Sequence, residues 1–421
     1  MQKVLIEGGY PLRGVIRVSG AKNAVLKLMA AALLGKGSFV IHDVPQIKDV
    51  FTMIGVLSAL GVEARFENSV LTLNIDQIHG EAPTELVREM RASIQVMGPL
   101  LARLGRVRIA KPGGCAIGDR PIDLHLKNLE RLGAVIDERH GYITAHCSRL
   151  IGQEISLDFP SVGATENIMM AATLAKGRTV IHNAAREPEI VDVQNFLNQM
   201  GAKISGAGTS EIVIEGVPED HIGNAEYTVI PDRIEAGTYL IAAAMTRGKI
   251  KLENVIPQHI QVLLSKLEET NAHLSVGPNT IVIEGGRNIQ PANIITLPYP
   301  GFATDLQPQF MSLVTLAQGS SVIKETIYSH RFGHVEELRR MGADIQLDSN
   351  SAVVRGVKQL SGASVRAMDL RAGAALVIAG LAAHGTTEIA GVEHIMRGYE
   401  KMIGKLQAVG AKIIQVDGES D

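Results

Sequence analysis

The chain has 421 residues, which is enough for two or three domains. Its apolar fraction of 46% and charged fraction of 20% are ordinary for a globular protein. The net charge is -3, tryptophan is absent and aromatic residues make up 4% of the chain. We therefore expect no nucleic-acid partner, because such proteins need a basic surface, often with stacking aromatics.

The chain shows no pattern of a membrane or secreted protein. Its first residues contain no long apolar run and do not resemble a signal peptide. The longest uncharged apolar stretch, residues 372–383, is too short for a bilayer, which needs ~20 residues. Two cysteines do not make a disulfide framework for a chain of this size. We predict a cytoplasmic protein without a membrane partner.

One phrase recurs six times along the chain: a helix of small apolar residues, a glycine and a short β-branched strand. Its first copy is "LMAAALLGKGSFVIHDV" and its last is "LVIAGLAAHGTTEIAGV". The helices carry almost no charge, so we expect them to be buried. The marker glycines stand roughly 70 residues apart, a spacing typical of internal repeats. They are Gly37, Gly105, Gly177, Gly248, Gly319 and Gly385.

A second phrase alternates with the first: an amphipathic helix, a helix-end residue and a strand, as in "LERLGAVIDE" and "LRRMGADIQL". The helix-end residue is glycine in five copies and asparagine in the fourth. Glycine, and after it asparagine, best tolerates the left-handed conformation that often ends a helix. These positions are Gly61, Gly133, Gly201, Asn271, Gly342 and Gly410.

Each repeat thus holds two βα elements, and it cannot bury its apolar faces alone. Six repeats exceed one ordinary core. The sequence therefore predicts an α/β fold of two similar globules with three repeats each.

Charged residues gather where the loops of the repeats lead into helices. Unpaired N–H groups and the helix dipole make such helix N-termini attractive to anions, which favours phosphate chemistry. The alternative is that Asp and Ser cap the helices and Arg pairs with them on the surface. The residues at these points are Lys22, Asn23, Arg88, Arg91, Ser161 to Thr165, Asp232, Arg233, Asp305, Arg331, Asp369, Arg371 and Arg397.

The stretch "AKPGGCAIGDRP" places Cys115 in a glycine-rich loop that is an insertion relative to its sister repeats. Lys111, Arg120 and the helix N-terminus that follows would lower a thiol pKa, which makes Cys115 a candidate nucleophile or acid. Cys147 lies in the alternating segment "YITAHCS", and we interpret it as a small structural residue.

Other motif searches are negative. The glycine-rich dinucleotide and nucleoside-triphosphate motifs are absent. His330 and His334 are four residues apart, but a metal site needs a third ligand. We therefore expect no metal and interpret His334 as a residue on a helix surface.

Several segments together resemble the enolpyruvyl transferases, over essentially the whole chain. They include "KNAVLKLMAA", "KPGGCAIGDRPIDLH", "PSVGATENIMMAA", "PDRIEAGT", "TDLQPQF" and "DLRAGAALV". The cysteine loop resembles the branch of the family that uses UDP-N-acetylglucosamine, since the sister enzyme of the shikimate pathway has no such loop.

The resemblance implies two similar domains, each with three βαβαββ repeats around a pseudo-threefold axis, an inside-out α/β barrel. One domain would be residues 21–230, which carry the Cys115 loop. The other would combine residues 1–20 with residues 231–421. The active site is expected in the cleft between the domains, which closes on substrate.

The implied reaction transfers the enolpyruvyl group of phosphoenolpyruvate to the 3′-hydroxyl of UDP-N-acetylglucosamine and releases phosphate, the first committed step of peptidoglycan synthesis. No cofactor is implied. Cys115 matches the family's proton donor and its site of covalent phosphoenolpyruvate addition, and Asp305 matches the base. Cationic side chains should surround the anionic intermediate. The matching cations are Lys22, Arg120, Arg331, Arg371 and Arg397.

Further positions match the family's substrate contacts. Lys22 and Asn23 match a phosphoenolpyruvate contact, and Asp369 also matches a substrate-binding position. The nucleotide sugar would be held by Asn23, Arg91, Arg120, Pro121, Ile122, Asp123, Leu124, Ser161, Val162, Gly163 and Ile327, and Asp305 also matches a substrate-binding position. Some members carry a lysine where this chain has Pro160, so a cationic contact from that position is not expected here.

Three alternatives compete with this interpretation. Six pseudo-repeats can form a ring-shaped clamp around DNA, but that requires a basic interior, which the uncharged helices do not supply. A shikimate-pathway transferase would use another acceptor, and the Cys115 loop argues against it. An inactive paralogue is disfavoured because every matched catalytic position is filled.

Overall fold

The structure is a computed structural model that describes residues 2–111 and 122–417. The chain divides into two compact units. Residues 20–111 and 122–230 form what we call the central unit, and residues 2–19 and 231–417 form the terminal unit. The division falls between Ser19 and Gly20 and between Ile230 and Pro231.

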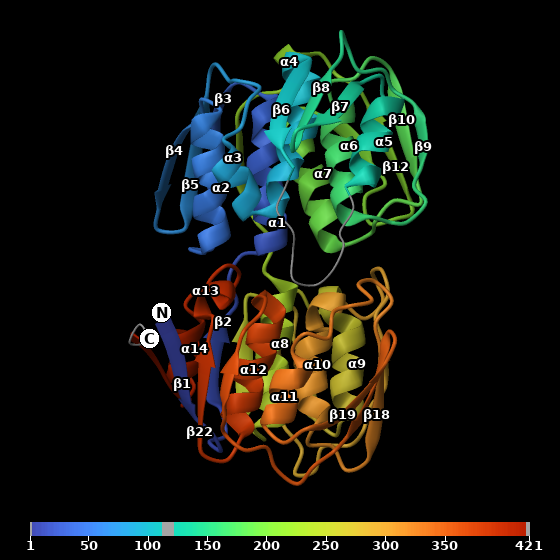
Figure 1. Ribbon diagram of the computed structural model, residues 1–421. Helices are drawn as coiled ribbons and strands as arrows, with labels where there is room; N and C mark the ends of the chain where they lie inside the picture. The colour runs from blue at the N-terminus through green and yellow to red at the C-terminus, as the bar shows by residue number, and fades with distance from the viewer. Residues whose placement is uncertain (1, 112–121, 418–421) are drawn as a thin grey trace. The chain divides into compact units, whose positions relative to one another are not determined.

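The central unit contains three repeats, each with its own small sheet (Figure 1). The first comprises α1 (Lys22–Ala31), β3 (Gly37–His42), α2 (Lys48–Ala59), β4 (Glu63–Glu67), β5 (Val70–Ile75) and, from the end of the unit, β13 (Ala225–Thr228). The second comprises α3 (Thr84–Glu89), the 3-10 helix η2 (Arg91–Val96), α4 (Met97–Leu104), β6 (Arg106–Ala110), α5 (Asp123–Arg131), β7 (Val135–Arg139) and β8 (Tyr142–His146). The third comprises β9 (Glu154–Ser156), α6 (Val162–Ala172), β10 (Arg178–His182), α7 (Pro188–Met200), β11 (Lys203–Ser205) and β12 (Glu211–Glu215).

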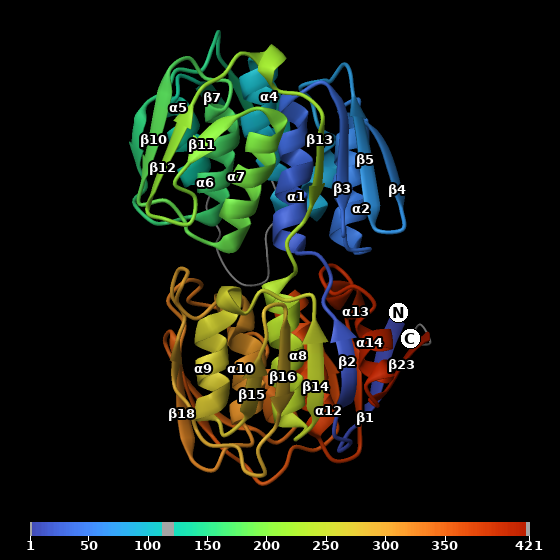
Figure 2. The ribbon, with the colours of Figure 1, turned by 180° about the vertical axis from the view of Figure 1, so that it is seen from behind.

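The terminal unit repeats the same pattern three times (Figure 2). Its first repeat comprises β2 (Arg13–Arg17), α8 (Arg233–Met245), β14 (Lys249–Glu253), α9 (Gln261–Glu269), β15 (His273–Val276) and β16 (Thr280–Glu284). The second comprises β17 (Ile294–Ile295), the 3-10 helix η5 (Thr304–Leu306), α10 (Gln307–Val314), β18 (Ser320–Lys324), α11 (Val335–Arg340), β19 (Asp344–Asp348) and β20 (Ser351–Arg355). The third comprises β21 (Ser364–Arg366), α12 (Leu370–Ala382), β22 (Thr386–Ala390), α13 (Val392–Ile395), α14 (Met402–Ala408), β23 (Lys412–Asp417) and β1 (Gln2–Glu7).

The predicted βαβαββ repeat is confirmed by the strand pairing. In five sheets a parallel pair adjoins antiparallel strands, as in the order β15-β16-β14-β2. A helix crosses over between the parallel strands in three of them, β9 and β10, β17 and β18, and β21 and β22. Three repeats are completed by strands distant in sequence: β1 lies between β22 and β23, β13 pairs with β3, and β2 pairs with β14. In the sheet of β6, β7 and β8, a single parallel bridge at Glu81 stands in place of the first strand.

The small apolar helices are buried, as predicted. All thirteen residues of α8 except Arg233 are buried, and α6 is buried from Ala164 onward. In the terminal unit α8, α10 and α12 pack against one another, and the sheets lie around them (Figures 1 and 2). Helices at the centre and sheets outside put the helix N-termini of each unit at one end, where the candidate residues lie.

The helix-end residues adopt the predicted left-handed conformation. Their φ angles are positive in all six copies, including 72° at Asn271. Among the described residues, no helix is long and apolar enough to cross a membrane.

Candidate active site

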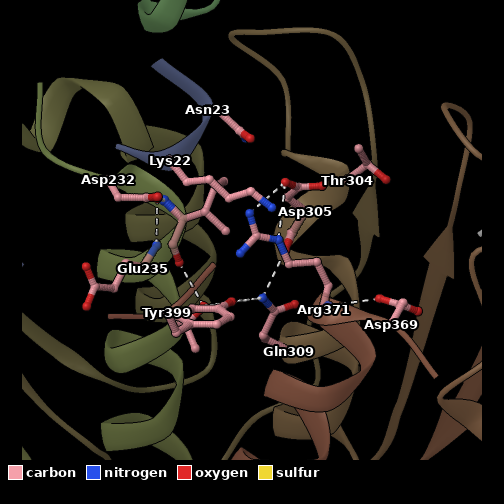
Figure 3. Close-up of polar contacts among 12 residues, drawn as sticks. Lys22, Asn23, Asp232, Glu235, Thr304, Asp305, Gln309, Asp369, Arg371 and Tyr399 are labelled. Carbon is pink, nitrogen blue, oxygen red and sulfur yellow. Dashed lines mark hydrogen bonds and ion pairs between the residues drawn. The ribbon is translucent and has the colours of Figure 1, made fainter. Parts of the chain in front are cut away.

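In the terminal unit, Asp305 lies between two arginines, Arg331 and Arg371. Figure 3 shows Asp305 beside Arg371. Oδ1 of Asp305 is 2.8 Å from Nη1 of Arg331, and its Oδ2 is 2.9 Å from Nη2 of Arg371. The Nε of Arg371 also donates to Oδ2 at 3.2 Å. The arginine side chains are 5% and 4% exposed, whereas the Asp305 side chain is 26% exposed. A carboxylate that solvent can reach is thus held by two buried cations.

This pairing sets the charge of Asp305. Burial by itself would raise the pKa of Asp305, but Arg371 and Arg331 outweigh that effect and hold the pKa well below its usual range. Asp305 is therefore ionised at neutral pH and is a weak base for as long as both arginines contact it.

Arg371 is positioned by the start of α12. Asp369 is the N-cap of this helix, and its Oδ1 accepts from the backbone N–H groups of Arg371 at 2.8 Å and of Ala372 at 3.0 Å. The guanidinium lies over the ring of Tyr399, 5.3 Å from its centroid. The Tyr399 hydroxyl is in turn held by Thr238 at 3.0 Å and by Gln309 at 3.2 Å.

Each arginine keeps a donor unused. Nε of Arg331 and Nη1 of Arg371 are buried and have no acceptor among the described residues. Buried N–H groups are normally paired, so these two invite an anionic ligand beside Asp305. Among the other predicted residues of this unit, Arg397 lies half-buried between α13 and α14, and Ile327 follows β18.

In the central unit, Lys22 and Asn23 begin α1. Nζ of Lys22 is 2.7 Å from Oδ2 of Asp49, a residue on α2. The carbonyl of Asn23 accepts from Nζ of Lys27 at 2.5 Å. Nζ of Lys27 also lies 3.5 Å from the buried carboxylate of Glu166 on α6. Lys22 and Lys27, five residues apart on α1, each pair with a carboxylate from another helix.

Ser161, Val162 and Gly163 form the start of α6. Ser161 is the N-cap, with its hydroxyl oxygen accepting from the backbone N–H of Ala164 at 3.3 Å. The Gly163 carbonyl accepts from Nε2 of Gln95 at 3.1 Å. A Cβ on Gly163 would lie 3.0 Å from the ring of His125, so only glycine fits without displacing a neighbour.

Asp123 and Leu124 open α5, with Ile122 before them, and Arg91 opens η2. Burial, and after it the charge of Arg91, lower the pKa of His125 to about 3. Three predicted residues, Cys115, Arg120 and Pro121, lie outside the described residues.

The interpretations of His334 and Cys147 from the sequence can now be compared with the structure. The prediction that His334 lies on a helix surface is wrong: it precedes α11, is 1% exposed and contacts Met311. Packing under α10 buries it, and this burial lowers its pKa to about 4. Cys147 is half-buried, as a structural residue would be, and burial raises the pKa of its thiol. No group of three metal-binding side chains occurs in residues 2–111 and 122–417.

Sequence reasoning missed several residues that shape the site. Asp49 ends the segment "DVPQIKD" at the start of α2, and the charge of that segment was a usable signal. Thr304, Gln95 and Glu325 carry no such signal, because the contacts of Thr304 with Glu325, of Gln95 with Gly163 and of Arg331 with Thr304 span at least 21 positions.

Two units of three repeats each, with sheets around buried helices, are the fold of the enolpyruvyl transferases. The family model of EPSP synthase (3-phosphoshikimate 1-carboxyvinyltransferase) matches residues 6–406. The chain belongs to this family of 1-carboxyvinyltransferases.

Its similarity to one branch is high. UDP-N-acetylglucosamine 1-carboxyvinyltransferase 1 of Caldanaerobacter subterraneus is 53% identical over 98% of this chain and 99% of that protein. UDP-N-acetylglucosamine 1-carboxyvinyltransferase 2 of Carboxydothermus hydrogenoformans is 54% identical over 99% of this chain and 100% of that protein.

Solved structures share the fold. The enolpyruvyl transferase NikO of Streptomyces tendae has a TM-score of 0.90 at 24% identity, covering 99% of both chains. EPSP synthase of Acinetobacter baumannii has a TM-score of 0.77 at 20% identity, covering 99% of this chain and 100% of that one. At these identities the likeness concerns the fold, and it agrees with the predicted fold class.

Proposed function

We propose that this protein transfers the enolpyruvyl group of phosphoenolpyruvate to the 3′-hydroxyl of UDP-N-acetylglucosamine and releases phosphate, at the first committed step of peptidoglycan synthesis. The relatives that carry this activity in their names are about half identical over nearly the whole chain. The structural observation that supports the proposal is Asp305 between Arg331 and Arg371, with two arginine donors left unused.

The chemistry requires an acid and a base. C2 of phosphoenolpyruvate becomes electrophilic when C3 is protonated, and we assign the proton to Cys115. The acceptor oxygen then bonds to C2 while its proton passes to Asp305. Loss of a proton from C3 with cleavage of the C2–O bond to phosphate restores the double bond and completes the transfer.

The low pKa of Asp305 gives the site a specific requirement. While both arginines contact the carboxylate, it accepts protons poorly. A phosphate or carboxylate that draws Arg331 and Arg371 toward itself leaves Asp305 less neutralised and raises its pKa. In this mechanism the anionic substrate activates the base. Arg120, Arg397 and Lys22 contribute further positive charge around the anionic intermediate.

The central unit would hold the nucleotide sugar. The start of α6, with Ser161, Val162 and Gly163, offers backbone N–H groups suited to an oxygen-rich ligand. Arg91, Arg120, Pro121, Ile122, Asp123, Leu124 and, from the terminal unit, Ile327 complete the proposed set. Lys22 and Asn23 would contact phosphoenolpyruvate, and Asp369 would support Arg371 at the start of α12.

Acceptor choice tests this function. Phosphate release from phosphoenolpyruvate should require UDP-N-acetylglucosamine and should not occur with shikimate 3-phosphate. The opposite acceptor preference would assign the chain to the shikimate-pathway branch, and release with neither would support an inactive paralogue.

The acid is tested by alkylation. An epoxide mimic of phosphoenolpyruvate should modify Cys115 and abolish turnover, with Cys147 as the internal control because burial raises the pKa of its thiol. Cys115→Asp should keep turnover and resist the epoxide, whereas Cys115→Ser should be far slower. An adduct at Cys147 in mass spectrometry would contradict the assignment.

We also propose that the protein acts in the cytoplasm, without a nucleic-acid or membrane partner.

A further inference from the structure

We propose that Glu325 is a positioning residue of this site: it orients Arg331 through Thr304 and holds the backbone at Ile327, a proposed nucleotide contact. The inference rests on the proposed function. Glu325 directly follows β18 and is fully buried, with an exposed fraction of 0%. Its carboxylate contacts Ile327 at the backbone N–H and reaches Arg331 only through Thr304.

The Glu325 carboxylate is hydrogen-bonded on both oxygens. Oε2 accepts from the Thr304 hydroxyl at 2.9 Å. Oε1 accepts from the Thr296 hydroxyl at 2.7 Å and from the backbone N–H groups of Ile327 at 2.8 Å and Tyr328 at 3.0 Å. A buried carboxylate with four donors stays in one orientation, because any rotation leaves a donor without an acceptor.

The first arm of this network leads to Arg331. Nη1 of Arg331 donates to the Thr304 hydroxyl oxygen at 3.0 Å as well as to Asp305. A hydroxyl has one hydrogen, and an arginine can only donate. The Thr304 hydrogen must therefore point at Glu325, so that the lone pairs of its oxygen face Arg331.

This direction matters for the substrate. With Nη1 shared between Thr304 and Asp305, the plane of the guanidinium is set, and Nε is left as the unused buried donor. Through Thr304, Glu325 thus orients the Arg331 side chain whose Nε is buried without an acceptor among the described residues.

The second arm leads to the segment after β18. Ile327 and Tyr328 donate their backbone N–H groups to the same Oε1. The Thr296 hydroxyl, which donates to Glu325, accepts from the backbone N–H of Thr326 at 2.9 Å. Glu325 therefore sets the path of the chain through Ile327.

Glu325→Gln separates this role from simple packing, because the side chains have nearly the same shape. With the amide oxygen toward Thr296, Ile327 and Tyr328, the amide nitrogen must donate to Thr304. The Thr304 hydrogen then turns toward Nη1 of Arg331, and two donors face each other. The opposite amide orientation instead opposes the three donors of the second arm.

The two arms predict different kinetics. Thr304→Val removes only the first arm, so kcat should fall about tenfold while KM for UDP-N-acetylglucosamine stays within about twofold. Thr304→Ser keeps the hydroxyl and should recover most of that loss. Glu325→Gln breaks the first arm when its amide oxygen faces Thr296, Ile327 and Tyr328, and it weakens the second, because a neutral amide oxygen accepts less strongly than a carboxylate. Its kcat should therefore fall about tenfold or more, and its KM for UDP-N-acetylglucosamine should rise about fivefold or more.

Coupling is the decisive comparison. In the double variant Thr304→Val with Glu325→Gln, kcat should be within about twofold of that of Glu325→Gln alone, because both act on Arg331 by one route. The matched control is Glu337→Gln. Glu337 is also a buried carboxylate of the terminal unit, 9% exposed, and accepts from the backbone N–H of Arg366 at 3.0 Å. It should change kcat and both KM values by less than about twofold.

Steady-state phosphate release and melting temperature would be measured for all variants. Additive losses of kcat, or wild-type kinetics in Glu325→Gln, would overturn the inference. A lower melting temperature of Glu325→Gln with both KM values unchanged would also overturn it, because that is the result expected for a purely structural residue. If Glu325→Gln does not fold, the Thr304→Val and Thr304→Ser pair decides the first arm. Turnover of the wild type with shikimate 3-phosphate instead would overturn the proposed function, while the same comparison of kcat would still judge Glu325.

Discussion

At the scale of single residues, Asp305 shows how an ion-paired carboxylate of the site is distinguished from a helix cap. Its place before α10 allows a capping role, yet neither η5 nor α10 has a side-chain cap. Both carboxylate oxygens instead contact Arg331 and Arg371. Substitution by asparagine distinguishes the two roles. Asparagine caps a helix as well as aspartate does, but it carries no charge to pair with the arginines.

We expect Asp305→Asn to lower both stability and activity. Two buried arginines lose their shared counter-charge, which should cost about 1–3 kcal/mol and lower the melting temperature. Loss of the proton acceptor should reduce kcat about 100-fold or more. Added inorganic phosphate should raise the melting temperature of the variant more than that of the wild type, because both arginines are then available to an anion.

Asp344→Asn is the control for this substitution. Asp344 forms an exposed ion pair with Arg355 at 3.3 Å in the same unit, so its loss should change stability by less than about 1 kcal/mol. An unchanged melting temperature in Asp305→Asn would show that the ion pairs contribute nothing. Near-normal kcat would mean that the base lies elsewhere.

At the scale of elements, the residues that end the amphipathic helices occupy the same place in every repeat. Each must adopt positive φ to turn the chain from helix into strand, and the surroundings differ from copy to copy. A Cβ at Gly342 or Gly410 would meet no atom within 4 Å, whereas a Cβ at Gly201 would lie 2.0 Å from the carbonyl oxygen of His221. Conformational cost and steric cost can therefore be measured separately.

We predict that Gly342→Ala costs about 1–2 kcal/mol, the price of left-handed backbone alone. Gly201→Ala should cost clearly more, because the same backbone cost is joined by a clash with backbone. Urea unfolding of both variants would test this order. Equal costs would mean that the chain at His221 yields freely.

Asn271 supplies the complementary test. It holds the left-handed position in the fourth copy at a φ of 72°. Asn271→Gly should be neutral or slightly stabilising, whereas Asn271→Ala should cost about 1 kcal/mol. A stabilising alanine would show that this helix end does not need its left-handed residue.

At the scale of the whole molecule, buried acids set how stability depends on pH. Burial raises the pKa of Glu166 to about 7 although Lys27 opposes it, and burial raises the pKa of Asp192 to about 7. As pH rises from about 4.5 to 7, the unfolded chain releases protons that these two folded carboxyls keep, so their contribution to stability falls. His125 and His334, whose pKa values burial lowers to about 3 and about 4, contribute in the opposite direction below the unfolded histidine pKa. Asp305 has the opposite shift, and its contribution is present above the unfolded pKa and lost as pH falls through the folded one.

The variant Glu166→Gln should therefore flatten the pH dependence. Between pH 5 and pH 7 the melting temperature of the variant minus that of the wild type should increase, because the variant lacks the contribution of Glu166 that falls with pH. The loss of the Lys27 partner adds an offset that does not depend on pH in this range. Melting curves at several pH values would show this. Parallel curves for wild type and variant would mean that Glu166 is ionised across the whole range.

The sequence alone determined the repeat, the buried helices, the left-handed helix ends and the fold class, because periodicity, lack of charge and glycine placement are local properties of the chain. It also located candidate residues at helix starts, since the repeat brings each of them to the same point. The resemblance of the motifs to the enolpyruvyl transferases supplied their expected roles.

Only the tertiary structure decided which of these groups meet. Asp305 contacts Arg371 across 66 residues and Thr304 contacts Glu325 across 21. Nothing in either segment indicates the partner, because the first contact joins two repeats and the second joins two elements within one repeat, and both form only when these elements pack. The same packing buried His334, which its own sequence context had placed on a surface. Burial and long-range pairing set the charge of Asp305 and the hydrogen-bond direction of Thr304, and neither is a property of a local segment.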